Sequence, residues 1–178
     1  MIGVKVTQKG NVSAVLKSLP ANVRGSARKA MRDTLKHVRA EIVRETVSKY
    51  YVTASRVRKA MTVEGTSIKV SGTREGIEQY KISPTKPGKR QREVLGAVKK
   101  GGLKPLGNNV FLMRTGNKYI PMARTTRKRF PIVHVISPAI PQIVSNPESM
   151  ENVGEDMQAY FGKRLEYWTM QQIGALKG

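Results

Sequence analysis

The sequence predicts an α+β fold in which long N-terminal and C-terminal amphipathic helices pack on a central, mainly antiparallel β-sheet. Two observations lead to this prediction. Apolar residues recur at steps of three and four in residues 21–49 and 147–177, whereas the intervening region alternates apolar and polar residues and is rich in turn-forming residues. Since the chain has 178 residues, 39% of them apolar, and no internal repeat, we expect a single globular domain.

The first long helix is predicted over residues 21–49, directly after Pro20. Its remaining faces are strongly basic, so one face is available for a core and the others for solvent or an anionic partner. A second, short helix is predicted over residues 53–61, with Thr53 or Ser55 as its N-cap. The apolar face of the first helix is formed by Val23, Ala27, Ala30, Met31, Leu35, Val38, Ile42 and Val43.

The middle of the chain is predicted to form strands. Residues 67–72 and 77–82 have alternating patterns and flank the turn-like "GTREG", which predicts a hairpin. Further strands are expected at 94–99, at 110–114 and 118–124 joined by "TGN", and at 131–137. Residues 83–93 contain no large apolar side chain but include prolines and a glycine, so we expect a mobile basic loop. Its basic residues are Lys86, Lys89, Arg90 and Arg92.

The second long helix is predicted over residues 147–177. Asn146 is a favourable N-cap, Pro147 suits the first helical position, and Glu148 lies near the positive end of the helix dipole. The dipole also accounts for the acidic residues of the first turns. One face of this helix carries Met150, Val153, Met157, Tyr160, Phe161, Leu165, Trp168 and Ile173.

The charge of the chain is its strongest functional signal. Thirty-three Lys and Arg residues against 12 Asp and Glu residues give a formal charge of +21, which favours an anionic partner over a merely solvated surface. Residues 1–146 hold 30 of the basic and 7 of the acidic residues, while 147–178 hold 3 and 5. We therefore expect the C-terminal helix to lie away from the anionic partner.

Two basic segments are the predicted contacts with DNA or an acidic protein. Lys and Arg suffice for sequence-independent phosphate contacts. Neither segment has the interleaved aromatic residues of a single-strand binder, and the basic first helix has no turn-helix partner of a sequence reader. The predicted contacts are Lys86, Lys89, Arg90 and Arg92 in the loop and Arg124, Arg127, Lys128 and Arg129 before residues 131–137.

The sequence offers little for catalysis, so we expect a protein that is not an enzyme and that needs no cofactor or metal ion. It has no cysteine, which excludes a thiolate nucleophile and a Cys-ligated zinc site. His37 and His134 lie in different predicted elements without a cluster of carboxylates, so each is expected to be an ordinary surface or half-buried histidine. No apolar run approaches the length of a membrane span, and we expect a soluble protein without membrane contact.

Two blocks of the sequence resemble a known family. The first, residues 19–63, combines a long basic amphipathic helix, an aromatic step, a short helix and a strand. The second, residues 108–144, combines an aromatic strand, a glycine turn, a strand with Arg, a basic turn and the pattern "R-x-P-I" followed by "P-x-x-P". Both blocks resemble the minor tail protein Z family of tailed bacteriophages, among the neck and tail-completion proteins; Ser137 stands where that family usually has glycine.

The resemblance implies a structural protein of the virion, located at the top of the tail and assembled in the bacterial cytoplasm. Such proteins complete the tail so that a head can join it, and the genomic DNA passes through this junction. Expected partners are the tail terminator and head-connector proteins, other copies of the chain in a six-fold ring, and the DNA through non-specific contact. The alternative is a free, sequence-independent nucleic-acid-binding protein.

The Pro-rich apolar turn after the basic segment has a predicted role in this scheme. We expect it to pack against the sheet or against an adjacent subunit, since proline loses little conformational entropy on ordering. The predicted interface residues are Pro131, Ile132, Pro138, Ile140, Pro141 and Ile143.

Overall fold

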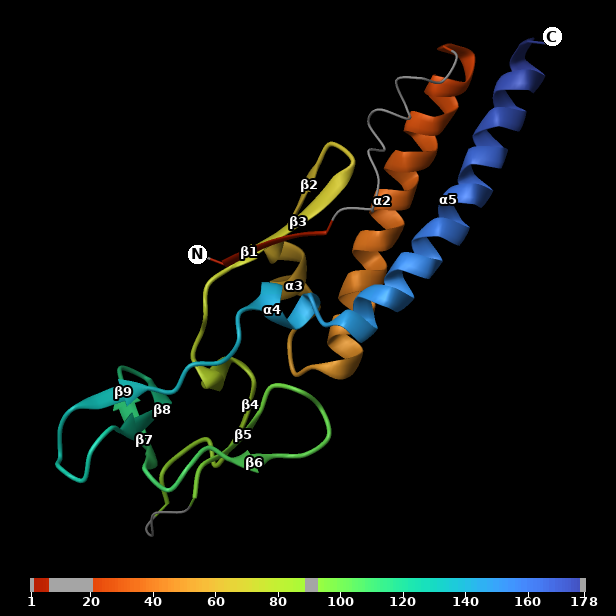
Figure 1. Cartoon of the computed structure of the whole chain (residues 1–178). Helices are drawn as coiled ribbons and strands as arrows, with labels where there is room; N and C mark the ends of the chain where they lie inside the picture. Colours follow the sequence, from red (N-terminus) through yellow and green to blue (C-terminus); the bar gives the residue numbers. More distant parts are fainter. Residues whose placement is uncertain (1, 7–20, 89–92, 177–178) are drawn as a thin grey trace.

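The structure, a computed structural model, describes residues 2–6, 21–88 and 93–176. It confirms the α+β class with antiparallel sheets and long helices near both ends. The two long helices, α2 (Ala21–Lys49) and α5 (Pro147–Leu176), lie side by side and antiparallel. They project from the rest of the molecule as a two-helix arm (Figure 1).

The strands form three small antiparallel sheets, and not the one central sheet that was predicted. The first sheet is ordered β1 (Ile2–Val6), β3 (Ser67–Gly72), β2 (Met61–Glu64) and lies beside α2 (Figure 1). The second joins β4 (Lys81–Ser83), β5 (Leu95–Ala97) and β6 (Lys104–Pro105). The third joins β7 (Val110–Thr115), β8 (Lys118–Arg124) and β9 (Ile132–His134). The second and third sheets make a separate lobe at the end away from the arm (Figure 1).

The predicted hairpin over 67–82 is wrong. β3 pairs with β2 through the two-residue loop Gly65–Thr66, in which Gly65 has φ +60°. Glycine adopts this φ without strain and is the preferred first residue of a type II′ hairpin turn. The sequence prediction had assigned Met61 to the preceding helix, which is α3 (Ala54–Ala60). Residues 77–79 instead form a 3-10 turn, and β4 pairs with β5.

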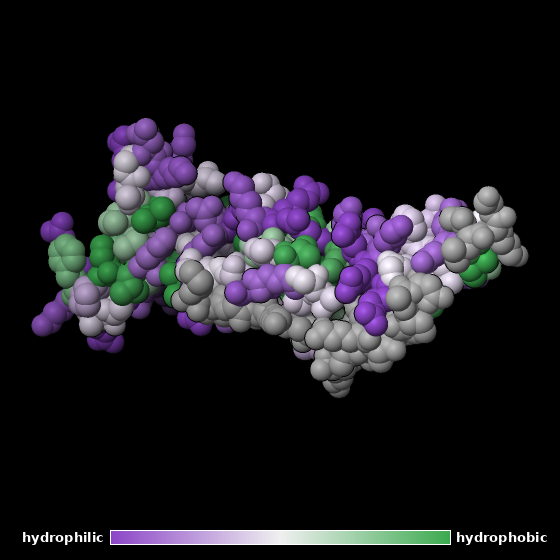
Figure 2. Space-filling model, turned by 90° about the horizontal axis from the view of Figure 1, so that it is seen from above, coloured by the Kyte–Doolittle hydropathy of each residue, from purple (hydrophilic) through white to green (hydrophobic). Residues whose placement is uncertain are grey.

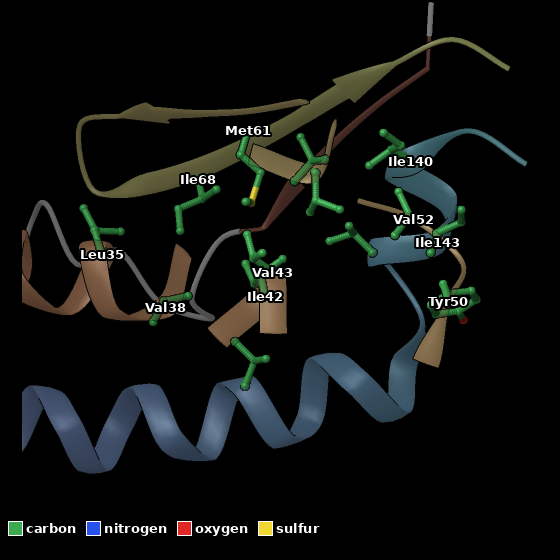
Figure 3. Close-up of a cluster of buried hydrophobic side chains, with 14 of the residues drawn as sticks. Leu35, Val38, Ile42, Val43, Tyr50, Val52, Met61, Ile68, Ile140 and Ile143 are labelled. Carbon is green, nitrogen blue, oxygen red and sulfur yellow. The ribbon is translucent and has the colours of Figure 1, made fainter. Parts of the chain in front are cut away.

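The main hydrophobic core lies where α2, α5 and the first sheet meet (Figure 3). Ile42, Val57 and Val70 are completely shielded from solvent. The helical spacing of α2 explains the choice of side chains, because its buried residues recur at steps of three and four and so face one side. The other members of the core include Met31, Leu35, Val38, Val43, Met61, Ile68, Ile140, Ile143, Val144 and Val153.

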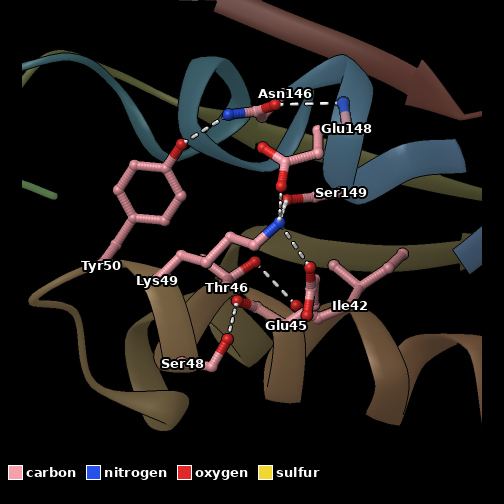
Figure 4. Close-up of polar contacts among 9 residues, drawn as sticks. All are labelled: Ile42, Glu45, Thr46, Ser48, Lys49, Tyr50, Asn146, Glu148 and Ser149. Carbon is pink, nitrogen blue, oxygen red and sulfur yellow. Dashed lines mark hydrogen bonds and ion pairs between the residues drawn. The ribbon is translucent and has the colours of Figure 1, made fainter. Parts of the chain in front are cut away.

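The base of the arm is fixed by polar contacts where α2 ends and α5 begins (Figure 4). Asn146 Oδ1 accepts a hydrogen bond from the Glu148 backbone N–H at 3.1 Å, which confirms Asn146 as the N-cap of α5. Its amide also donates to the Tyr50 hydroxyl at 2.9 Å. Lys49 Nζ reaches Glu45 at 2.8 Å and Glu148 at 3.2 Å. The first turn of α5 is thereby tied to the last turn of α2.

Farther along the arm, polar and aromatic contacts replace the apolar core. Asp33 Oδ2 accepts hydrogen bonds from Arg164 Nη2 at 2.6 Å, from Arg164 Nε at 3.0 Å and from the Trp168 indole N–H at 3.0 Å. Ser26 Oγ lies 2.6 Å from Gln172 Oε1. The hydrogen bonds that Asp33 accepts lower its pKa below the ordinary value of 3.8. The bonds from Arg164 are the largest cause, and the bond from Trp168 is the next.

The lowered pKa of Asp33 predicts how the arm responds to acid. A carboxylate with a lowered folded-state pKa contributes stability that is complete above about pH 5 and is lost as the pH falls through the folded-state pKa. Asp33→Asn should therefore reduce the thermal unfolding midpoint at neutral pH. Below the folded-state pKa of Asp33, the midpoints of the variant and the wild type should lie closer together. Unfolding curves between about pH 2 and pH 7 check this. Glu166→Gln, at an exposed position of the partner helix α5, is the control; a pH profile of Asp33→Asn parallel to wild type would contradict the assignment.

Candidate functional site

The basic segment between β8 and β9 forms an exposed loop over residues 125–131. Its two ends are held together by the Thr125 backbone N–H, which donates to the Pro131 carbonyl at 3.3 Å. Inside the loop, Thr126 Oγ1 accepts a hydrogen bond from the Lys128 backbone N–H at 3.2 Å. These local bonds define the turn and leave the long basic side chains outside it.

The cations of this loop are exposed and have no ion pair within the described parts of the chain. Arg127, Lys128 and Arg129 are all exposed. The Arg129 guanidinium lies 5.7 Å from the ring centre of Phe130, whose exposed fraction is 63%. Arg124, at the end of β8, is half-buried and lies 4.4 Å over the Phe111 ring. The loop therefore presents three free cations, while Arg124 is positioned at its base.

The second predicted basic segment is only partly described. Lys86 is exposed, in agreement with an exposed loop. Lys89, Arg90 and Arg92 lie outside the described residues. Of the four predicted contacts in this segment, the structure thus describes Lys86.

The surface around the 125–131 loop also carries apolar side chains. Hydrophobic residues gather at the end of the molecule that carries β7–β9 (Figure 2). Val133 and Ile136 have exposed fractions of 46% and 54%, close in sequence to the 63% exposed Phe130. Cations mixed with exposed apolar groups are suited to a protein surface as well as to phosphate.

The predicted subunit-interface residues are in part buried inside the protein and in part exposed. Residues Ile140–Val144 form the short helix α4, which sequence reasoning missed, and Ile140, Pro141 and Ile143 are buried there. Ile140 and Ile143 belong to the main core (Figure 3). Of the two predicted alternatives, the turn packs on the chain's own sheet. Pro131 and Pro138 are exposed and Ile132 is half-exposed, so these three remain open to a partner.

The environment of His37 was also missed. The imidazole stacks on Tyr160, with ring centres 3.9 Å apart, and its Nε2 lies 2.7 Å from Asp156 Oδ2. Glu41 lies one helical turn along α2. One potential metal-ligand atom from each of His37, Glu41 and Asp156 lies within 4.8 Å of the others. The expectation that His37 lies away from carboxylates is therefore wrong. The sequence alone places Glu41 one helical turn after His37. Asp156 reaches His37 only because α5 packs against α2.

The side chains of the His37 cluster already have ion-pair partners within the protein. Glu41 forms an ion pair with Arg44 at 2.6 Å, and Asp156 pairs with the imidazole itself. His134 makes a simpler pair with Glu78 at 2.9 Å. Neither arrangement places a nucleophile beside a base, as covalent catalysis requires.

A basic groove with a volume of about 790 Å³ lies on the helical part of the molecule. It runs between α2 and α3 and extends to the segment after β5. Five of its lining residues are cations, and none is a carboxylate: Lys36, Arg39, Arg44, Arg58 and Lys100. The sequence showed α2 to be basic, but it could not show that α3 and Lys100 join the same surface.

Comparison of this chain with models of protein families, with curated proteins and with solved structures finds no match. None of the described helices has both the length and the apolar character needed to span a membrane.

The burial of Ile140 changes what its substitution should do. Ile140→Asp should destabilise the folded chain by at least about 3 kcal/mol, because a carboxylate would replace a core side chain. Urea denaturation followed by circular dichroism measures this. The matched control is Ile136→Asp at a 54% exposed position, with an expected change within about 0.5 kcal/mol. A stable, folded Ile140→Asp monomer would restore the prediction of an intermolecular contact.

Proposed function

We propose that this chain is a structural protein of a phage virion that completes the tail and mediates head–tail joining around the DNA channel, as an oligomeric ring. The observation that carries the proposal is the exposed loop 125–131, with three cations that have no ion pair among the described residues. Such a loop suits sequence-independent contact with DNA or with an acidic neighbouring protein.

The two sequence blocks that resemble the minor tail protein Z family support the same proposal. The described part of the first block runs from α2 through α3 to β2, and the second runs from β7 to α4. Within the first block α3 contacts both α2 and β2, and within the second β8 pairs with both β7 and β9. The tail terminator and head connector are the proposed neighbours, and the proposed location is the virion.

The alternative function is a free, sequence-independent nucleic-acid-binding protein. The formal charge of +21 favours this alternative equally. The two proposals differ in affinity, because a tail protein needs to contact DNA strongly only when a ring multiplies its weak contacts. A free binding protein would bind as a single chain at physiological salt.

The proposed tail role is tested by deleting this reading frame from the phage or prophage that carries it and examining the particles by electron microscopy. Filled heads beside unattached or irregularly long tails are expected, since joining would fail after each part had formed. Complementation with the wild-type chain from a plasmid should restore joined particles. Normal infectious virions from the deletion would contradict the proposal.

The role of the loop is tested by the triple substitution Arg127→Gln, Lys128→Gln and Arg129→Gln. Each lost phosphate contact should reduce the slope of log K against log salt by roughly 1 for a short DNA duplex. Fluorescence anisotropy at several salt concentrations measures the slope. The control with equal net charge is Lys59→Gln, Lys104→Gln and Lys163→Gln, all at exposed positions. Equal slopes for the two triple variants would reject the loop as the DNA contact.

A further inference from the structure

The groove between α2 and α3 is a second basic surface, and it contains no residue of loop 125–131. Its cations come from three separate parts of the chain: Lys36, Arg39 and Arg44 from α2, Arg58 from α3, and Lys100 from the segment after β5. Lys100 is held there because its backbone N–H donates to the Lys49 carbonyl at 2.8 Å. The convergence is therefore part of the fold.

Arg39 is the best-positioned cation of the groove. Its Nη2 donates to the Arg58 carbonyl at 3.1 Å, which holds the guanidinium between α2 and α3. Its Nε is shielded from solvent and has no hydrogen-bond partner among the described residues. The bond to the Arg58 carbonyl therefore fixes a positive charge between α2 and α3, where it can complement an acidic partner.

The groove also has an apolar lining. Ala40 is exposed and Val47 half-buried on α2, and Ala54 lines the groove from α3; Val43, between the first two, is a buried core residue. These side chains are short, so another helix can approach closely, and they offer no hydrogen bond to a sugar or a phosphate. A DNA duplex would gain from the cations but not from this lining, whereas aliphatic side chains would gain from both.

We propose that this groove is a docking site for an acidic amphipathic helix of a partner protein. The apolar side chains of that helix lie on Ala40, Val47 and Ala54, and its carboxylates face the surrounding cations, of which Arg44 also pairs with Glu41. This is the helix-in-groove mode of recognition, with charge complementarity selecting the partner. The inference does not depend on the virion role, because it rests on the groove alone.

The test uses two synthetic peptides of about 16 residues with the same Leu, Ala and Glu composition. One places Leu at helical spacing on one face, and the other permutes the order so that no apolar face forms. Anisotropy of the labelled peptides is measured with the full chain at about 0.15 M salt. The peptide with Leu on one face, called the ordered peptide, should bind at least about tenfold more tightly than the permuted one. Equal affinities would overturn the proposal, because charge alone would then explain binding.

Three variants show where on the protein the ordered peptide binds. Arg44→Gln with Arg58→Gln should weaken the ordered peptide at least about tenfold, and Ala40→Trp should block it by filling the apolar lining. The triple variant at Arg127, Lys128 and Arg129 should bind as wild type. Thermal unfolding verifies that each variant is folded; Arg44 and Ala40 are exposed positions on α2. Loss of affinity in the loop variant equal to that in the groove variants would overturn the proposal.

Two other occupants are distinguished by the same proteins. A DNA duplex of about 20 base pairs that binds through Arg44 and Arg58 and displaces the ordered peptide would assign the groove to nucleic acid. Self-association that is lost in Ala40→Trp, measured by sedimentation velocity, would assign it to a second copy of this chain. Either result would overturn the proposal of an acidic partner helix.

Discussion

The antiparallel pairing of α2 and α5 is the interaction on which the rest of the structure depends. It joins two segments from nearly opposite ends of the described chain, and it provides one wall of the main core. The pairing changes character along its length: the base is apolar, with Ile42 and Val153 buried, and the far end is held by Asp33, Arg164 and Trp168. Without α5, the core face of α2 would be open to water over several turns.

The same pairing determines where the positive charge is available. Since α5 covers the apolar face of α2, the cations of α2 point elsewhere, and α3 and Lys100 combine with them to form the groove. In the first turn of α5, Glu148 pairs with Lys49 at the base of the arm. The loop 125–131 lies in the separate β lobe. The molecule thus presents two basic surfaces, one on the helices and one on the lobe.

Local patterns predicted both long helices, α3 and several strands, but they missed α4 and could not predict contacts between residues distant in sequence. The spacing of Val38 and Ile42 and the N-cap Asn146 are local signals, and both long helices followed from such signals. The hairpin was misplaced because its first strand was assigned to residues 67–72 and Met61 to the preceding helix, whereas the observed pairing joins Met61–Glu64 to β3. The exposed cations of loop 125–131 were predicted. The groove and the Asp156 partner of His37 were not, since each requires elements more than a dozen residues apart to meet.

Native-state hydrogen exchange tests most directly whether the α2–α5 pair is the foundation of the fold. The free energy of exchange reports the opening that exposes each amide, and the most protected amides mark the most cooperative part of a structure. We expect the slowest exchange at the centres of α2 and α5 and in β3, with faster exchange in β7–β9, which lie outside the main core. Equal or greater protection of β7–β9 would contradict this account, because the lobe would then be stable without relying on the helix pair.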